Sequence, residues 1–353
     1  MLSRFERDQL QYLLHQTVAL KGTQWPNPAV GAMVCIEGDI ISEGYHISAG
    51  EDHAEVIALK RAGSASKGAT LIVTLEPCVH VGKTPACVDA IINAGISRVI
   101  WAIDDPNPVV YGKAKAILEA KGISVLGHCL PEEGFACIKE FYTFHQRNRP
   151  FIYLKSAVSL DGKIAPDNTK LHYISSSKSL EKVQDLRRLV QGICVGVGTI
   201  NTDLPQLSIR DSQAQPSIIV MDPKGQINRS WLNDICNSGR HVIHCTTGFF
   251  EFQHDLYTPY RKLGDDKSKN WENLWLYLAT EHQMHAILVE AGSGVFRSMF
   301  TSELWDEFWV FRVPKFFNHG VSWGNGPLPD IPLSVKTIEV LSEDTLTIYT
   351  HAI

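Results

Sequence analysis

The chain has 353 residues, enough for two domains, and 44% of them are hydrophobic and 20% charged. A net charge of -5 and a pI near 6.3 provide no broad basic surface for gathering phosphates, so we expect no nucleic-acid partner. Charges interrupt residues 1–20, and no segment approaches the roughly 18 uncharged apolar residues of a membrane span, so we expect neither a signal peptide nor a membrane partner. Eight cysteines are too few for a disulfide scaffold, which favours a cytoplasmic location.

The first half of the chain predicts a layered α/β domain. Short apolar runs predict strands at 30–35, 71–74, 99–102 and 123–126, and helical patterns separate them. Gly95 and Gly122 are expected to end two helices, and residues 132–144 predict a further helix that leads to Pro150. We therefore place one domain at 1–148 and a second at 149–353.

The second half predicts another sheet. Its apolar runs lie at 152–154, 193–197, 218–221, 241–244, 287–289 and 308–311. Helical segments follow several of these runs, which favours a largely parallel sheet. The polar segment 251–270 has weak patterning, and we assign no element or role to it.

A metal site is predicted by His53, Glu55, Cys78 and Cys87, which supply one imidazole, one carboxylate and two thiols. Three nitrogen and sulfur ligands leave one tetrahedral position of zinc open, where the pKa of bound water falls to about 7. Zinc deaminases share this His-x-Glu plus Pro-Cys…Cys signature, and their glutamate is a general acid/base and not a ligand. We predict His53, Cys78 and Cys87 as zinc ligands and Glu55 as the catalytic residue.

Local structure supports the prediction and also offers alternatives. Thr84 before Pro85 predicts a helix start, so Cys87 would lie in a first turn that favours a thiolate. Asp52 and Glu55 have the spacing of a capping box, in which Glu55 would only bond the backbone. A closed structural zinc site would need a fourth ligand, such as His80 or Asp52.

Further motifs follow one another along nearly the whole chain. They are Pro26 to Gly31, Gly44 to His46, Thr74 to Cys78, Val79 to Ala86, Asp105 to Pro108, Arg149 to Pro150, Leu154 to Ala157, Ser159 to Ala165, Leu186 to Arg187, Val195, Gly196, Thr199, Asp203, Pro205, Leu207, Arg210 and Val289 to Glu290. In this order the motifs closely resemble the bifunctional riboflavin-biosynthesis deaminase/reductase family of the RibD type. Residues 222–285 match that family poorly.

The resemblance implies an α/β fold in two parts: an amino-terminal cytidine-deaminase-like three-layer domain and a carboxy-terminal dihydrofolate-reductase-like domain. It implies a zinc-dependent deaminase acting on a diaminopyrimidinone that carries a ribosylamine 5'-phosphate. It also implies an NADPH-dependent reductase that converts the ribosyl group to ribityl. We therefore expect Zn²⁺ and NADPH as cofactors, a small pyrimidine ribosylamine phosphate as partner, and a homo-oligomer.

The resemblance also implies roles for individual residues. The residues expected to contact the deaminase substrate are Asn27, His46, Lys83, Asp105 and Asn107. The residues expected to contact NADPH are Ala157, Tyr173, Thr199, Asp203, Gly292 and Gly294. The residues expected to contact the reductase substrate are Lys155, Asp161, Leu171, Arg187, Leu207, Arg210 and Glu290. For several of these residues the alternative is a purely structural role. Asp161, for example, would only form a turn before Gly162.

Three departures from the family pattern support a second interpretation. Leu171 replaces a small hydroxyl residue, Tyr173 replaces a tryptophan, and Ala291 replaces a glycine next to the expected pyrophosphate. A methyl group at Ala291 would obstruct that approach if the position needed a positive φ. The alternative function is therefore a deaminase whose carboxy-terminal domain only binds or oligomerises. A nucleic-acid base deaminase is a further alternative, which the acidic charge and the long gap between Cys78 and Cys87 oppose.

Overall fold

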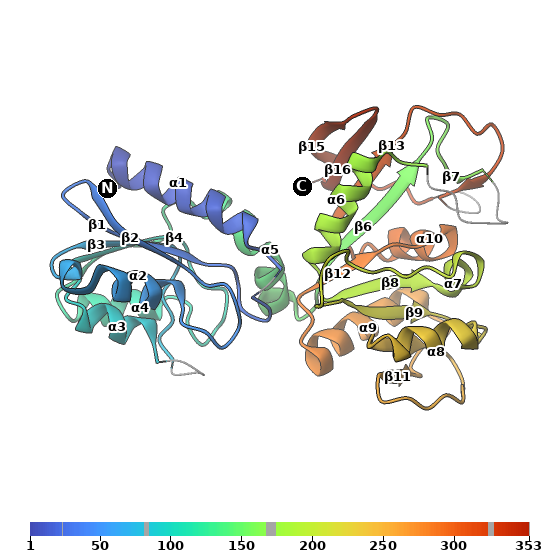
Figure 1. Ribbon diagram of the computed structural model, residues 1–353, viewed down its shortest axis with the longest axis horizontal. Coiled ribbons are helices and arrows are strands. Elements are labelled where there is room, and N and C mark those ends of the chain that lie inside the picture. The colour runs from blue at the N-terminus through green and yellow to red at the C-terminus, as the bar shows by residue number, and fades with distance from the viewer. Residues whose placement is uncertain (23, 81–84, 167–173, 324–327, 353) are drawn as a thin grey trace. The chain divides into compact units, whose positions relative to one another are not determined.

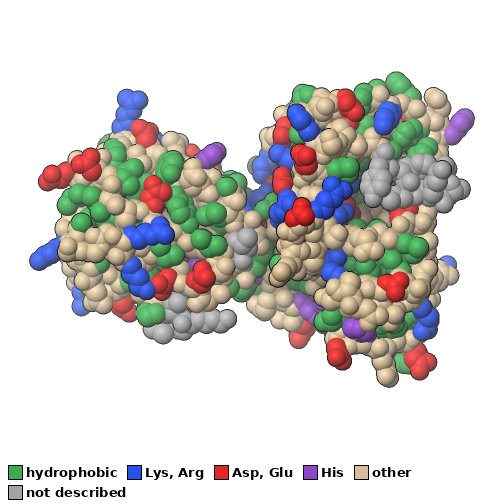
Figure 2. Space-filling model, viewed as in Figure 1, with side chains coloured by type: hydrophobic (Ala, Val, Ile, Leu, Met, Phe, Trp, Pro, Cys, Tyr) green, Lys and Arg blue, Asp and Glu red, His purple; other side chains and the backbone are tan. Residues whose placement is uncertain are grey.

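The computed structural model describes residues 1–22, 24–80, 85–166, 174–323 and 328–352. Contacts divide the chain into two compact units, Met1–Asn148 and Arg149–Ile353. Figure 1 shows the helices and strands of both. On the face drawn in Figure 2, Lys and Arg side chains are interspersed with Asp and Glu on each unit, as expected for a chain with nearly balanced charge.

The first unit is built on a five-stranded mixed sheet with the order β2-β1-β3-β4-β5. The strands are β1 (Gly31–Ile36), β2 (Asp39–Tyr45), β3 (Thr70–Leu75), β4 (Arg98–Ile103) and β5 (Ser124–Leu126). β1 pairs antiparallel with β2 and β3, whereas β3, β4 and β5 are parallel. The carboxyl ends of β3 and β4 therefore meet at one edge of the sheet.

Helices cover both faces of this sheet and make three layers (Figure 1). The helices are α1 (Arg4–Ala19), α2 (Ala54–Ala62), α3 (Cys87–Asn93), α4 (Lys113–Glu119) and α5 (Pro131–Arg147), with a short 3-10 helix at Gly63–Ser66. Successive strand residues point to opposite faces. Met33 and Ile72 pack with α1 and α5, while Val34 and Val73 pack with α2, α3 and α4.

Each predicted strand of the first half is present. The predicted helix ends are also confirmed, because Gly95 and Gly122 follow α3 and α4 with φ of +70° and +80°. The sequence analysis missed β2. This edge strand mixes polar with apolar residues, and its exposed residues are consecutive, from Asp39 to Ile41, so it lacks a clear alternating pattern.

The second unit contains a nine-stranded sheet with the order β11-β10-β9-β8-β12-β6-β13-β16-β15. All neighbours from β11 to β13 are parallel, and β16 and β15 join antiparallel. The bounds are β6 (Phe151–Val158), β8 (Gly192–Gly196), β9 (Ser217–Met221), β10 (Val242–Cys245), β11 (Tyr257–Tyr260), β12 (Ala286–Val289), β13 (Glu307–Arg312), β15 (Leu333–Leu341) and β16 (Asp344–His351). A separate pair joins β7 (Lys163–Ala165) to β14 (Val321–Ser322).

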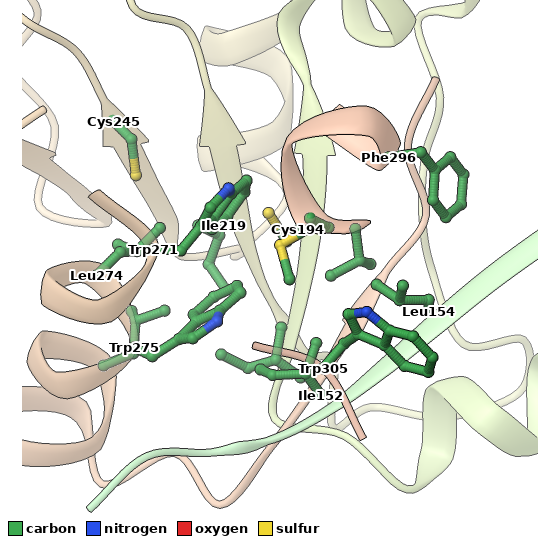
Figure 3. Packing of buried hydrophobic residues seen from close by; sticks show 14 of the residues in the cluster. Ile152, Leu154, Cys194, Ile219, Cys245, Trp271, Leu274, Trp275, Phe296 and Trp305 are labelled. Atoms are coloured by element: carbon green, nitrogen blue, oxygen red, sulfur yellow. The ribbon is translucent and has the colours of Figure 1, made fainter. Parts of the chain in front are cut away.

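Both faces of this sheet are packed. The helices are α6 (Ser177–Arg188), α7 (Val197–Asp203), α8 (Arg229–Asn237), α9 (Lys267–His282) and α10 (Ser293–Ser302). Figure 3 shows Trp271 and Trp275 of α9 beside Ile219 of the sheet, while Phe296 of α10 lies on the side of Leu154, and all five belong to one cluster of buried residues. On the other face, Val183 of α6 packs in a cluster with Phe311 and Leu346.

The largely parallel sheet predicted for the second half is confirmed, and each predicted strand is present. Segment 251–270, left without an assignment, contains the edge strand β11 and the start of α9. The strands β15 and β16 were also missed, and β15 is exposed along most of its length. No helix in the described part of the chain combines the length and apolar character that crossing a bilayer requires.

Burial of Ile72 predicts a large loss of stability on truncation. Ile72 is 0% exposed between two helical layers, so Ile72→Ala should lower the free energy of unfolding of the first unit by about 3 kcal/mol. Ile40 of β2 is 47% exposed, so Ile40→Ala serves as the control and should change the free energy of unfolding by less than about 0.5 kcal/mol. Denaturant titration followed by circular dichroism measures both, and equal effects would contradict the layered packing.

Candidate functional sites

The three predicted zinc ligands converge in the first unit. His53 immediately precedes α2, Cys78 follows β3, and Cys87 is the first residue of α3. Nδ1 of His53 lies 3.2 Å from Sγ of Cys87 and 3.5 Å from Sγ of Cys78. The three ligand atoms all lie within 4.8 Å of one another. One nitrogen and two sulfurs fit zinc with an open fourth position.

The local structure favours a thiolate at Cys78. The backbone N–H of Cys87 donates to Sγ of Cys78 over 3.3 Å. Hydrogen bonding from Cys87 and His53 lowers the pKa of the Cys78 thiol, although burial acts in the opposite direction. Cys87 lies in the first turn of its helix, as predicted. The predicted helix start is wrong, because α3 begins at Cys87 with Ala86 as its N-cap, and Thr84 lies outside the described residues.

Glu55 is buried beside the ligands, in the first turn of α2, with 4% of its surface exposed. Burial raises the pKa of its carboxyl, and Cys78 adds to the rise while His53 opposes it. The alternative capping box is not formed, because His53 is the N-cap and the Asp52 carboxylate pairs with Lys60. Glu55 is therefore placed for proton transfer and has no capping role.

Gly44 allows α2 to rest closely on β2. A Cβ atom at Gly44 would overlap the carbonyl oxygen of Ala54 and come within 2.5 Å of the backbone nitrogen of Ala58. No real side chain fits such a gap, so helix and strand meet backbone to backbone. The close packing positions the helix start that carries His53 and Glu55.

Two predicted substrate residues form a pair next to the metal site. The side-chain amide of Asn27 donates to Nε2 of His46 over 3.0 Å, and Nδ1–H of His46 donates to the carbonyl oxygen of Asp52 over 3.1 Å. This carbonyl only accepts, so the proton resides on Nδ1. The rings of His46 and His53 have centroids 5.3 Å apart.

Asp105 and Asn107 lie on the loop after β4. Asp105 is buried, and burial raises the pKa of its carboxyl to about 7, with Glu76 and Cys78 adding to the rise. Its Oδ1 accepts from the backbone N–H of Asn107 over 2.8 Å, and Oδ1 of Asn107 accepts from the backbone N–H of Val109 over 3.0 Å. Lys83 lies outside the described residues.

Glu76 organises this loop and received no role from the sequence. It is 2% exposed. Its carboxylate accepts from the backbone N–H groups of Asp105 at 3.3 Å, Gly112 at 3.0 Å and Ala114 at 3.1 Å. An acid directly after an apolar strand and two residues before Cys78 was the available signal. Glu76 thus links the strand that leads to the metal with the loop that carries Asp105.

In the second unit, the predicted reductase residues line a cavity of about 1020 Å³. Strands β6, β8 and β9, the segment after β12, helix α6 and the starts of α7 and α10 contribute to its wall. The predicted residues that line it are Lys155, Ala157, Arg187, Thr199, Asp203, Leu207, Arg210, Glu290, Gly292 and Gly294. Leu171 and Tyr173 lie outside the described residues.

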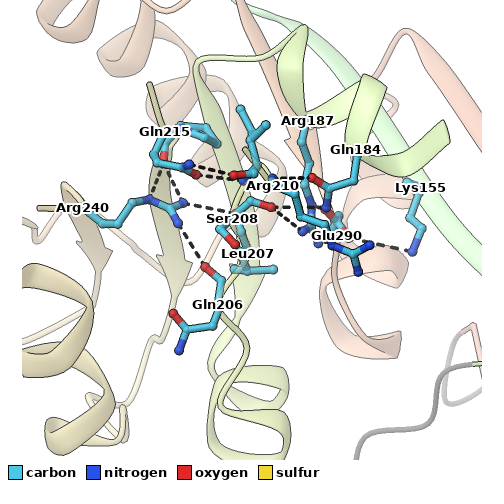
Figure 4. A network of polar contacts seen from close by, with 12 residues as sticks. Lys155, Gln184, Arg187, Gln206, Leu207, Ser208, Arg210, Gln215, Arg240 and Glu290 are labelled. Atoms are coloured by element: carbon cyan, nitrogen blue, oxygen red, sulfur yellow. Dashed lines mark hydrogen bonds and ion pairs between the residues drawn. The ribbon is translucent and has the colours of Figure 1, made fainter. Parts of the chain in front are cut away.

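A charged cluster forms one part of the cavity wall (Figure 4). Arg187 binds Glu290 with two bonds, Nε to Oε1 at 2.6 Å and Nη2 to Oε2 at 3.1 Å. Nζ of Lys155 lies 3.8 Å from Oε2 of Glu290. Burial acts to raise the pKa of Glu290, but the charges of Arg187 and Lys155 outweigh it and lower that pKa. Burial lowers the pKa of Lys155. Glu290 is therefore held as a carboxylate between two cations.

Two helices begin at the cavity. Gly292 is the N-cap of α10 and Gly294 lies in its first turn, while Gly196 is the N-cap of α7. Exposed backbone N–H groups at helix starts favour phosphate groups. The methyl group of Ala291 was expected to obstruct the pyrophosphate only if this residue had a positive φ. Ala291 does not have a positive φ, so that reason for obstruction does not apply.

Asp161 lies apart from these residues and is not part of the cavity wall. Its carboxylate accepts from Oγ of Ser159 at 2.6 Å and from the backbone N–H groups of Phe317 at 3.1 Å and Asn318 at 2.8 Å. These bonds form the local turn that was the alternative for Asp161, and its contact with the substrate stays a prediction.

The metal site and the cavity define a zinc-dependent deaminase followed by a nucleotide-dependent reductase. The cytidine and deoxycytidylate deaminase zinc-binding region matches residues 6–103, and the RibD C-terminal domain matches residues 150–347. The riboflavin biosynthesis protein RibD of Aquifex aeolicus is 36% identical over 99% of both chains, and that of Escherichia coli is 34% identical over 83% of both. The chain belongs to the RibD family of bifunctional deaminases and reductases.

Solved structures support the same family membership. The Thermotoga maritima deaminase/reductase matches with a TM-score of 0.87 and 32% identity, covering 98% of this chain and 99% of that one. Acinetobacter baumannii RibD matches with a TM-score of 0.88 and 27% identity over 98% and 99%. Family membership confirms the predicted fold class, both enzyme classes, and zinc and NADPH as cofactors. It does not favour a deaminase with a degenerate second domain.

Loss of one zinc ligand should empty the metal site. Cys87→Ser should lower the zinc content of purified protein to a small fraction of that of the unmodified chain, because serine is a poor zinc ligand. Cys129 of the same unit is not one of the ligands, so Cys129→Ser is the matched control and should retain zinc. Mass spectrometry of the metal measures both, and retention of zinc by Cys87→Ser would contradict the assignment.

Proposed function

We propose that this chain deaminates a diaminohydroxyphosphoribosylaminopyrimidine in residues 1–148 and reduces 5-amino-6-(5-phosphoribosylamino)uracil in residues 149–353. These are the two activities named for the Thermotoga maritima relative. The observation that carries the first activity is the convergence of His53, Cys78 and Cys87 beside buried Glu55. The gathering of the predicted reductase residues around one cavity supports the second.

In the deaminase step, His53, Cys78 and Cys87 would hold zinc, which supplies an acidified water at neutral pH. Glu55 would take one proton from a water molecule and pass it to a ring nitrogen while the water oxygen bonds to the adjacent ring carbon. It would then take the second proton of that oxygen and pass it to the amine, whose C–N bond breaks to release ammonia. Burial suits this task because it raises the pKa of Glu55, so the carboxyl both accepts and releases protons.

Substrate contacts complete the deaminase proposal. Asn27, His46, Asp105 and Asn107 would contact the pyrimidine and ribose, and Lys83 the phosphate as a point charge. The hydrogen bonds of His46 hold its ring in one orientation. Asp105 has a pKa near neutrality, so its carboxyl is able to donate or accept toward a ring edge.

In the reductase step, the chain positions NADPH, which supplies the hydride, against the opened ribose carbonyl. Ala157, Tyr173, Thr199, Asp203, Gly292 and Gly294 would contact the cofactor. Lys155, Asp161, Leu171 and Glu290 are proposed near the sugar, and Arg187, Leu207 and Arg210 near its phosphate. The helix starts at Gly196 and Gly292 support a dinucleotide at this cavity.

A cytoplasmic location and a homo-oligomeric state are part of the proposal. All eight cysteines are free, which is compatible with a reducing compartment. Size-exclusion chromatography with light scattering tests the oligomeric state.

Glu55→Gln should abolish deamination without loss of the metal. Glutamine retains the shape of the side chain but cannot carry the proton, so ammonia release should fall by about 10²–10⁴-fold. Glu119 is exposed at the end of α4, and Glu119→Gln is the control that should retain full activity. Ammonia release and zinc content are measured together. Full activity of Glu55→Gln would contradict the proposal.

Glu290→Gln should impair reduction alone. Without the carboxylate, the charges of Arg187 and Lys155 are uncompensated, and NADPH oxidation with the deaminated substrate should slow by about 10²-fold. Ammonia release should be unchanged. Glu303→Gln is the exposed control. In a coupled assay, ammonia release with no NADPH oxidation by the unmodified chain would overturn the reductase half of the proposal.

A further inference from the structure

The segment that links α7 to β9 brings Leu207 and Arg210 to the cavity in an unusual conformation. Leu204, Leu207 and Asp211 have positive φ values of 44°, 49° and 57°. Residues with side chains rarely adopt this region, which costs about 1 kcal/mol or more at each position, so the surrounding structure must hold the segment in place. We call residues 204–211 the substrate loop.

Side chains from other elements hold the backbone of the substrate loop at successive positions (Figure 4). Nε1 of Trp231 donates to the carbonyl oxygen of Pro205 over 3.0 Å. Arg187 and Gln184 donate to the carbonyl oxygen of Ser208 at 3.0 and 3.3 Å. Oε1 of Gln184 accepts from the backbone N–H of Arg210 over 2.8 Å.

Arg240 contacts both the substrate loop and the segment beyond it. It lies before β10 and is 5% exposed. Its Nη1 donates to the carbonyl oxygen of Gln206 at 3.0 Å and its Nη2 to that of Leu207 at 3.3 Å. Its Nε and Nη2 donate to the carbonyl oxygen of Pro216, beyond the loop, at 3.0 and 2.7 Å. One planar guanidinium thus ties the middle of the loop to the segment before β9.

The chemistry of Arg240 is that of a buried cation bound to backbone dipoles. Within the described residues it makes no ion pair with Asp or Glu. Burial lowers its pKa to about 10, with the charge of Arg187 contributing, so the guanidinium remains protonated at neutral pH. A buried charge without a counter-ion is costly, and here backbone carbonyl groups alone compensate it. Its replacement would release the loop rather than break a salt bridge.

We infer that Arg240 is a positioning residue for the reductase, which holds the substrate loop in the conformation that presents Leu207 and Arg210 to the sugar phosphate. This inference rests on the proposed function of the loop. It also assigns a task to part of residues 222–285, the stretch that matches the family pattern poorly. Arg240 is not among the residues that line the cavity, so it would act through the loop.

This role predicts a particular kinetic pattern. An ordered loop binds the ground state and the transition state equally well, so its release should raise KM for the phosphorylated substrate and leave kcat unchanged. The proposed NADPH contacts at Thr199 and Asp203 lie on α7 and those at Gly292 and Gly294 lie at the start of α10, all outside the loop, so the Kd for NADPH should change little. A general loss of structure would instead affect both.

The test is steady-state kinetics of Arg240→Met and Arg240→Lys with 5-amino-6-(5-phosphoribosylamino)uracil and its dephosphorylated form, together with the Kd for NADPH from calorimetry. Arg240→Met should raise KM for the phosphorylated substrate by about tenfold, with kcat and the Kd for NADPH within about twofold of the unmodified chain. Arg240→Lys should have an intermediate KM. Its ammonium group still donates to backbone carbonyl groups, but it reaches fewer of them than the guanidinium does. If Arg240→Met folds poorly, Arg240→Lys carries the same comparison.

Arg149→Met is the matched control. Arg149 is a largely buried arginine near the start of β6, and it binds Asp306 through Nη1 at 2.6 Å and Nη2 at 2.8 Å. Its replacement should lower the melting temperature without a selective change in KM. An unchanged KM in Arg240→Met, or an equal loss of NADPH affinity, overturns the inference. Equal KM values of the unmodified chain for the two substrate forms overturn the proposed phosphate-binding function itself.

Discussion

Both sites depend on a constraint of parallel sheets: neighbouring strands that run in one direction end at one edge. In the first unit, β3 and β4 end side by side, so the segment after β3 supplies Cys78 and the segment after β4 supplies Asp105. In the second unit, β8 and β12 are neighbours, and Gly196 and Glu290 follow from them into one cavity. Residues far apart in sequence meet because the pairing of the strands brings their ends together.

The loops at these edges are held by buried charges that bind backbone groups. Glu76 accepts three backbone N–H groups in the first unit, and Arg240 donates to carbonyl groups in the second. The two side chains thus both supply hydrogen-bond partners to the backbone of a loop, one as an anion and the other as a cation. A loop near a site has no regular pairing of its own, so its backbone groups need partners, and a multivalent side chain satisfies several at once.

The sequence predicted most of the sheets because their central strands are apolar runs bounded by turn residues. It missed β2 and β15, which are edge strands whose buried and exposed residues do not alternate. The metal ligands and Glu55 were predictable because their chemistry is local and their spacing is characteristic. The roles of Glu76 and Arg240 were not, since they arise from contacts between distant segments. The capping box of Asp52 and Glu55 was also a valid local pattern, and it is excluded by the observed N-cap, His53, and by the pairing of Asp52 with Lys60.

The absent side chain at Gly44 has a consequence for how the first site tolerates change. His53 and Glu55 begin a single rigid helix, and that helix touches β2 where the strand carries no Cβ. A bulkier residue there would push the metal ligand and the proton carrier aside as one body, keeping their mutual spacing while misaligning both with the two sulfurs. The loss of function would then arise at Gly44, which is not a metal ligand and lies on β2 in contact with the helix.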